Sequence, residues 1–162
     1  MPFIKNLMSV SIMEKMKMIN TTLCYIEKDG AYLMMHRIKK QNDINKDKWV
    51  GIGGKFLDNE TPFDCARREI FEETGLTAKS LIYRGIVTFV SNEFGTEYMH
   101  LFTCKDFSGE INTDCNEGKL EWVKISDVYS LPLWAGDKIF LSLLEKDTPF
   151  FSLKLVYDGE WL

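Results

Sequence analysis

The stretch from residue 54 to residue 76 constrains the fold most, because it predicts a helix with both ends marked. Thr61 is a favourable N-cap residue, Pro62 suits the first helical position, and Asp64 occupies the place of a capping-box acid. A glycine follows Thr74, where it provides a C-terminal stop. We therefore expect a helix that runs from the proline to about Thr74.

Three carboxylates lie on one side of this expected helix. Glu69, Glu72 and Glu73 are spaced i, i+3 and i+4, next to an apolar stripe. Like charges at this spacing cost helix stability unless a cation lies among them. A solvated acidic face is one interpretation. Oxygen ligands with room for water are also those that Mg²⁺ prefers, and the glycine pair 53–54 and Arg68 nearby favour a magnesium site.

These residues also resemble the Nudix box, G-x5-E-x7-R-E-U-x-E-E-x-G-U, in which U is a bulky aliphatic residue. Every defined position is filled, by Gly54, Glu60, Arg68, Glu69, Ile70, Glu72, Glu73, Gly75 and Leu76. Weaker similarity to MutT-type, nucleotide-sanitising members extends over most of the chain. The resemblance implies the α+β fold of that family, an α/β/α sandwich with a mixed β-sheet between helices.

The whole chain fits one domain with a sizeable core, since it has 162 residues, of which 45% are hydrophobic and 27% charged. Its net charge of -4 gives no support for binding a nucleic-acid polymer, which usually requires a basic surface. No run of about 18 apolar residues predicts a membrane span. The expected partner is a small molecule, and the chain is expected to act as a monomer or homodimer.

The four cysteines show neither a C-x-x-C motif nor zinc-ligand spacing; they are Cys24, Cys65, Cys104 and Cys115. Buried free thiols and a cytoplasmic location are expected. Residues 1–18 fit either an amphipathic lead-in helix or a frayed, flexible extension, and no signal peptide is recognisable there. Residues 19–162 form the single expected domain.

Alternating and apolar runs predict strands on both sides of the expected helix. They cover residues 21–28 and 31–38 around the hairpin signal Asp29-Gly30, then 49–52, 80–91 with a bulge at Gly85, 96–103, 120–123 and 150–157. Residues 39–48 read as a polar loop. Ser126 is expected to cap a short helical turn at 127–129, and a second helix is expected from Trp134 to about residue 145.

The resemblance implies a site for one or more divalent ions, Mg²⁺ with Mn²⁺ as a substitute. Its expected ligands are the backbone oxygen of Gly54 and the carboxylates of Glu69, Glu72 and Glu73, with Glu72 or Glu73 also assisting as a base. Glu60 would lie near this shell, and Arg68 would orient the carboxylates. For a further acid, Glu97 is preferred to Glu93, although either could be a surface acid.

Contacts with the substrate are expected from two regions. Arg37 and Lys55 are candidates for phosphate binding, with a solvated cation as the alternative for each. In some MutT-type enzymes a tryptophan stacks on the base and acids read its edge. Trp134 and Asp137 match by position, although Trp134 could instead pack at the helix start. The chain departs from that pattern at Val50, which replaces an asparagine, and at Gly136, which replaces one of two acids.

The leading functional hypothesis is Mg²⁺-dependent hydrolysis of an oxidised purine nucleoside triphosphate, such as 8-oxo-dGTP, to the monophosphate and pyrophosphate. This activity would sanitise the nucleotide pool and so serve DNA repair. ADP-ribose or a dinucleotide polyphosphate is the alternative substrate. ADP-ribose-cleaving members often carry a proline after the box, and none occurs here between Pro62 and Pro132. A non-catalytic nucleotide sensor and a merely solvated acidic helix are further alternatives.

Overall fold

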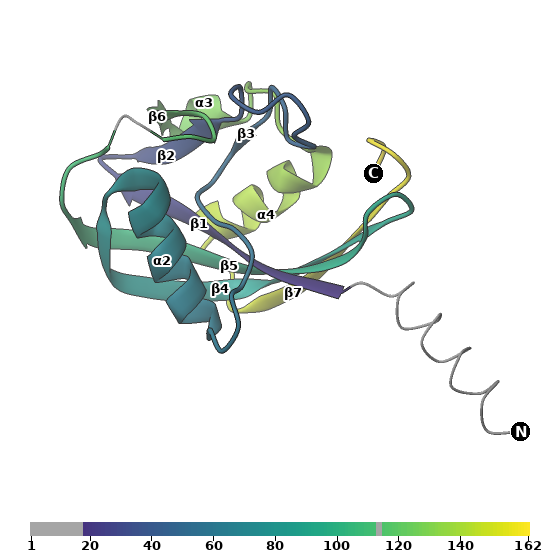
Figure 1. Ribbon diagram of the computed structural model, residues 1–162, viewed down its shortest axis with the longest axis horizontal. Helices are drawn as coiled ribbons and strands as arrows, with labels where there is room; N and C mark the ends of the chain where they lie inside the picture. The colour runs from purple at the N-terminus through teal and green to yellow at the C-terminus, as the bar shows by residue number, and fades with distance from the viewer. Residues whose placement is uncertain (1–17, 113–114) are drawn as a thin grey trace, which may run out of the picture.

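The computed structural model describes residues 18–112 and 115–162 (Figure 1). Residues 1–17 of the expected extension lie outside the described residues, and Met18 already belongs to the first strand. In chain order the elements are β1 Met18–Lys28, β2 Ala31–His36, β3 Trp49–Val50, α2 Pro62–Thr74, β4 Thr77–Ser91, β5 Gly95–Ser108, β6 Lys119–Lys124, α3 Ile125–Val128, α4 Ala135–Glu145 and β7 Phe151–Tyr157.

The strands form one mixed, seven-stranded sheet in the order β3-β2-β1-β5-β4-β7, with β6 paired to β2. β1 is parallel to β5 and β4 is parallel to β7, whereas β4 and β5 are antiparallel. Two separate cores flank the sheet: Ala66 and Ile70 of α2 belong to one, and Phe140 and Leu141 of α4 belong to the other. The expected α+β sandwich, with helices on both sides of a mixed sheet, is confirmed (Figure 1).

The local signals that predict α2 act in the structure as expected. The Thr61 hydroxyl accepts a hydrogen bond from the Asp64 N–H at 3.1 Å, and the Asp64 carboxylate accepts one from the Thr61 N–H at 3.0 Å. Pro62 is the first helical residue. Gly75 ends the helix with φ = 78°, a left-handed conformation that a residue with a side chain adopts only at a cost.

The strands β1 and β2 pair only next to their turn, and this places the site. Their register is limited to Glu27 with Tyr32 and Lys28 with Ala31, where Asp29 and Gly30 form the predicted turn. Farther along, β1 pairs instead with residues 51–55. In this pairing the Thr22 N–H donates to the Gly54 oxygen at 2.9 Å. The glycine turn therefore runs antiparallel beside β1, in the position that β2 leaves open.

Strand periodicity assigns the residues of β5 to opposite faces. Met99 and Leu101 lie in the core under α4, whereas Phe102 and Cys104 lie in the core under α2. Since side chains two residues apart share a face, Glu97 belongs to the α4 side. The Glu97 carboxylate and the carboxylates of α2 therefore lie on opposite sides of the sheet.

The other predicted strands are present, but β2 ends at His36 rather than at residue 38, and β3 ends at Val50 rather than at residue 52. The bulge at Gly85 is present as a shift in the register between β4 and β5. The prediction that Ser126 caps a helical turn is wrong: α3 begins at Ile125, Lys124 is its N-cap, and no side chain caps it. Ser126 thus lies inside the turn, with its hydroxyl directed to Asp127. No helix in the described part of the chain is long and apolar enough to cross a membrane.

Candidate functional site

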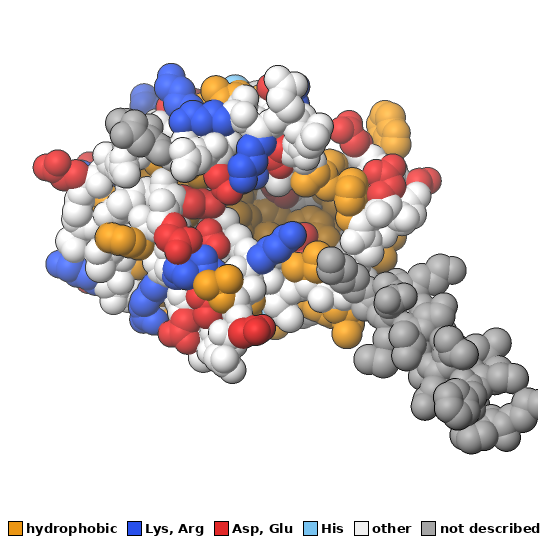
Figure 2. All heavy atoms as spheres, in the orientation of Figure 1, with side chains coloured by type: hydrophobic (Ala, Val, Ile, Leu, Met, Phe, Trp, Pro, Cys, Tyr) orange, Lys and Arg blue, Asp and Glu red, His pale blue; other side chains and the backbone are white. Residues whose placement is uncertain are grey.

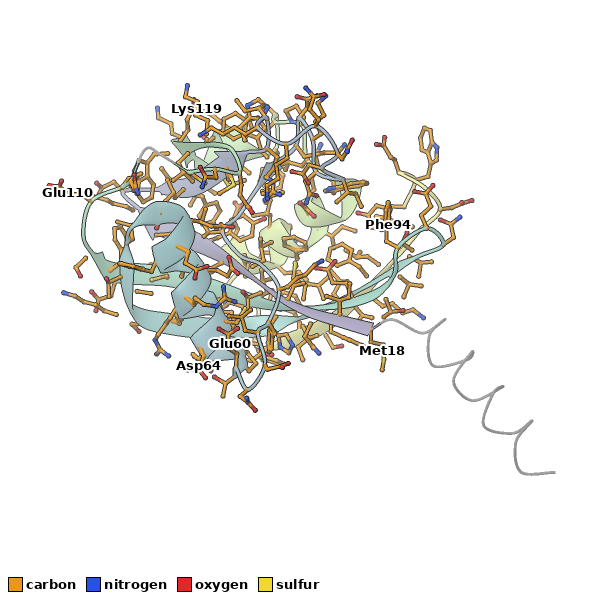
Figure 3. All side chains as sticks on the ribbon, in the orientation of Figure 1. Met18, Glu60, Asp64, Phe94, Glu110 and Lys119 are labelled. Carbon is orange, nitrogen blue, oxygen red and sulfur yellow. The ribbon has the colours of Figure 1, made fainter. Side chains whose placement is uncertain are left out.

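One cavity of about 710 Å³ joins the acidic side of α2 to the start of α4. At one end it is lined by Gly53, Gly54, Glu69 and Glu73, and at the other by Trp134 and Asp137. Figure 2 shows the hollow with an apolar floor and with charged side chains on the rim beside α2. Figure 3 labels Glu60 beside α2, and Phe94 across the cavity near the turn between β4 and β5. The cavity is therefore polar at one end and mostly apolar at the other.

Arg68 connects three of the carboxylates predicted for the site. Its Nε lies 2.5 Å from a Glu60 oxygen, and its Nη1 lies 2.6 Å from Glu69 and 3.1 Å from Glu72. Its Nη2 also donates to the Lys55 carbonyl at 3.0 Å, which ties the helix to the glycine turn. The hydrogen bonds from Arg68 lower the pKa of Glu60 to about 2. Arg68 thus occupies the place expected of a residue that orients the acids.

Glu73 is the most deeply buried acid of α2, with 8% of its surface exposed. One of its oxygens accepts a hydrogen bond from the Gly53 N–H at 3.3 Å. Burial raises the pKa of Glu73 to about 9, and the charges of Glu117 and Glu69 act in the same direction. The neighbouring Glu117 contributes to this rise in the pKa of Glu73, whereas Glu73 acts to lower the pKa of Glu117.

Glu117, in the loop before β6, is a residue of this cluster that the sequence interpretation missed. Its carboxylate lies 2.6 Å from Arg37 Nη1 and 2.9 Å from Lys40 Nζ. Burial opposes its ionisation, but Lys40 and Arg37 together lower the pKa of Glu117. The only local signal for Glu117 in the sequence is the Glu-Gly pair before a short predicted strand. The position of Glu117 in the cluster could not be predicted from this signal, because it depends on the long-range pairing of β6 with β2.

Arg37, expected to bind phosphate, is already engaged by two acids. Its Nε lies 2.6 Å from Asp43 and its Nη1 contacts Glu117, and only 15% of its side chain is exposed. These ion pairs connect β2 to the loop of residues 39–48 and to the loop before β6. Lys55 is different, because its side chain is exposed at the cavity and no ion pair of Lys55 occurs within the described residues.

Glu97 does not join the acids of α2, since it lies on the face of the sheet covered by α4. Its Oε1 accepts a hydrogen bond from the Thr21 hydroxyl at 2.6 Å. The acids that act electrostatically on Glu69 are Glu72 and Glu117, and those that act on Glu73 are Glu117 and Glu69. Glu97 acts instead on the carboxyl of Asp137. The expectation that Glu97 completes the metal shell therefore has no geometric support.

At the apolar end, Asp137 and Trp134 lie where α4 begins. Asp137 is 5% exposed. Burial raises its pKa to about 7, with Lys48 opposing the shift and Glu97 adding to it. The Trp134 indole N–H donates to Asn45 at 2.8 Å, and the Lys48 ammonium lies 4.7 Å from the centre of its ring. Both predicted base-contacting residues thus line the cavity.

Gly136 has no room for the second acid of the MutT-type pattern. A Cβ atom there would lie 2.5 Å from Leu155 Cδ1 and 2.6 Å from the Tyr157 hydroxyl oxygen. That hydroxyl accepts a hydrogen bond from the Gly136 N–H at 2.8 Å. A side chain at position 136 would therefore require Leu155 and Tyr157 to move, and Val50 lines the cavity in place of an amide.

The acids near α2 suit a divalent cation by their chemistry. Glu69, Glu72, Glu73 and Glu117 supply hard oxygen donors, and the pKa of Glu73 is raised first by burial and then by the charges of Glu117 and Glu69, both of which a bound cation would offset. In the described ranges, no three His, Cys, Asp or Glu side chains already form a metal-binding arrangement, since Arg68 holds Glu69 and Glu72. Binding a cation therefore requires these side chains to reorient.

The backbone oxygen of Gly54, another predicted ligand, accepts the Thr22 N–H and lies 3.6 Å from Cys65 Sγ. This oxygen is therefore directed toward β1 and the buried face of α2. The Glu69 carboxylate packs directly against this glycine, because a Cβ on Gly54 would lie 2.5 Å from it. Gly54 thus affects the acidic cluster through its lack of a side chain.

Comparisons with known proteins agree with this architecture. The family model described as "NUDIX domain" matches residues 16–144. A Bacillus subtilis protein described as "Uncharacterized Nudix hydrolase YvcI" is 28% identical over 144 residues, covering 86% of this chain and 87% of that protein. A Danio rerio protein described as "Oxidized purine nucleoside triphosphate hydrolase" is 34% identical over 127 residues, covering 76% and 77%.

Among solved structures, the MutT protein from Bacillus halodurans superimposes with a TM-score of 0.78 at 26% sequence identity. The similarity covers 89% of this chain and 93% of that one. The family model spans most of the chain and includes the whole box on α2. The chain therefore belongs to the Nudix family and is a hydrolase that acts on a diphosphate bond.

Proposed function

We propose that the protein hydrolyses a purine nucleoside triphosphate, in particular an oxidised one such as 8-oxo-dGTP, to the monophosphate and pyrophosphate. The observation that carries this proposal is the single cavity, which joins the acids of α2 to Trp134 and the buried Asp137. Such a cavity suits a ligand with a polyphosphate at one end and an aromatic base at the other. Relatives from Danio rerio and Mus musculus, 34% and 30% identical, are described as hydrolases of oxidised purine nucleoside triphosphates.

At the phosphate end, we assign Mg²⁺, or Mn²⁺ in its place, to Glu69, Glu72, Glu73 and Glu117. When bound, the cation would neutralise phosphate charge that otherwise repels the hydroxide-like nucleophile formed as the water loses its proton. The backbone oxygen of Gly54 remains a proposed ligand, although its hydrogen bond to β1 makes it the least accessible donor. Glu97 is left out of this proposed ligand set, because its carboxylate lies on the α4 side of the sheet and accepts the Thr21 hydroxyl.

The other residues at this end hold the acidic side chains in place or take up a proton. Arg68 holds Glu60, Glu69 and Glu72 in place through its hydrogen bonds. Glu72 or Glu73 takes a proton from the attacking water; Glu72 is the more exposed of the two. Of the two, Glu73 lines the cavity, whereas Glu72 is held beside it by Arg68.

Two cations and the start of α4 bind the substrate. Lys55 is free to contact phosphate at the mouth of the cavity. Arg37 binds phosphate only if it exchanges Asp43 or Glu117 for a phosphate oxygen. Trp134 stacks on the base and Asp137 binds its edge. We place this activity in the cytoplasm, in agreement with four buried free cysteines, and expect a monomer or homodimer acting in nucleotide-pool sanitisation.

A panel of nucleotides assayed with Mg²⁺, with identification of products, tests the proposal. The expected result is turnover of purine nucleoside triphosphates to monophosphate and pyrophosphate, highest for 8-oxo-dGTP. Cleavage of ADP-ribose or a dinucleotide polyphosphate without turnover of any triphosphate would refute the substrate assignment. Binding of a nucleotide without any turnover would instead indicate a sensor.

A further inference from the structure

Glu97 places a carboxylate in the apolar half of the cavity, away from the acids of α2. It lines the same cavity as Trp134 and Asp137. It projects from β5 on the face that α4 covers, because it shares the strand parity of Met99 and Leu101. The catalytic chemistry proposed above assigns no role to this group.

The surroundings of Glu97 are largely apolar. Leu23, Phe89 and Met99 line this part of the cavity, and Phe89 is paired directly with Glu97 across β4 and β5. A carboxylate among such groups is costly unless its oxygens accept hydrogen bonds. The Thr21 hydroxyl supplies one at 2.6 Å, which fixes the side chain but leaves other lone pairs available.

A second carboxyl, that of Asp137, lies close enough to Glu97 for the two to interact electrostatically. The two groups come from different elements that line the cavity, β5 and the first turn of α4. Position 136 supplies no acid in this chain, because it is a glycine packed against Leu155 and the Tyr157 hydroxyl. The acid paired with Asp137 in this chain is therefore provided by the sheet.

We propose that Glu97, together with Asp137, makes the site selective for a purine whose edge carries two adjacent N–H donors, which is a guanine-type base. The inference rests on the proposed function. A carboxylate accepts hydrogen bonds from the ring N–H and the neighbouring amino group of guanine. Adenine presents one amino donor next to a ring nitrogen that is itself an acceptor. That acceptor would face a carboxylate oxygen with no proton between them.

The test compares guanine-type with adenine-type substrates in the wild type, in Glu97→Gln and in Asp106→Asn. Asp106 is an exposed acid on the same strand and serves as the control. In the wild type, kcat/KM for 8-oxo-dGTP and dGTP should exceed that for dATP. Glu97→Gln should reduce this preference at least about tenfold, through a higher KM for guanine-type substrates, while kcat for dATP changes little. Asp106→Asn should retain the wild-type preference.

Two further measurements separate this inference from the proposed activity. The affinities of dGMP and dAMP, measured calorimetrically without metal, should show the same preference and the same loss in Glu97→Gln, whether or not any triphosphate is hydrolysed. The Mg²⁺ concentration for half-maximal activity should be unchanged in Glu97→Gln. An unchanged base preference in this variant would overturn the inference. A raised Mg²⁺ requirement would also overturn it, by returning Glu97 to the metal shell.

Discussion

Replacing the buried carboxyl of Asp137 by an amide should remove one source of pH dependence from the stability of the fold. Burial raises its pKa from an ordinary 3.8 to about 7 in the folded protein. The folded protein therefore holds this proton more tightly than the unfolded chain does. The resulting stabilisation is present at low pH and is lost as the pH rises from about 4 through about 7.

The size of the effect follows from the shift. A difference of about three pH units at about 1.4 kcal/mol each gives ~4 kcal/mol of stability lost by the wild type across this range. Asn has nearly the shape of a protonated Asp but does not titrate. Asp137→Asn should therefore resemble the wild type near pH 4 and become progressively more stable than it toward neutrality.

Urea denaturation at several pH values, with a chelator present to remove metal ions, measures this difference. The free energy of unfolding of Asp137→Asn minus that of the wild type should rise by about 1.4 kcal/mol per pH unit between pH ~4.5 and ~6.5. The exposed Asp127 provides a matched control, since Asp127→Asn should show no such slope. A difference that stays constant with pH would show that the pKa of Asp137 is not raised in the folded protein. It would refute the claim that burial at the apolar end of the cavity disfavours the charged carboxylate.

Three further substitutions test the phosphate end. Gly54→Ala would place a Cβ 2.5 Å from the Glu69 carboxylate, so Mg²⁺ affinity measured by calorimetry should fall at least about tenfold; unchanged affinity would exclude Glu69 as a ligand. Arg68→Gln frees Glu60 and Glu69, and should lower the free energy of unfolding by about 2 kcal/mol and kcat by more than about tenfold. Thr61→Ala removes the N-cap and should cost about 1 kcal/mol in urea denaturation with kcat nearly unchanged.

The elements that could be predicted from the sequence are those specified by neighbouring residues. The limits of α2 were predicted correctly because Thr61, Pro62 and Gly75 act within one turn of the helix. The turn at Asp29-Gly30 was predicted correctly for the same reason, since both residues adopt positive φ. The N-cap of α3 was not, because its start follows from where β6 ends rather than from a capping side chain.

The candidate site divides in the same way. The acids of α2 were recognisable from their spacing, whereas Glu117 joins them only through the antiparallel pairing of β6 with β2. The sequence leaves Arg37 either a phosphate ligand or a solvated cation; its ion pairs with Asp43 and Glu117 could not be predicted, because they form between a strand end and two irregular loops. The position of Glu97 could have been inferred from strand parity, which groups it with Met99 on the α4 side.

The central claim is that the acids of α2 serve a metal-dependent cleavage of the triphosphate chain. Phosphorus NMR of 8-oxo-dGTP hydrolysis tests it most directly, with wild type and Glu73→Gln, each with and without Mg²⁺. The account predicts monophosphate and pyrophosphate from the wild type with Mg²⁺, little product without the metal, and a loss of at least about a hundredfold in Glu73→Gln. Release of inorganic phosphate, or equal rates in Glu73→Gln and the wild type, would contradict it.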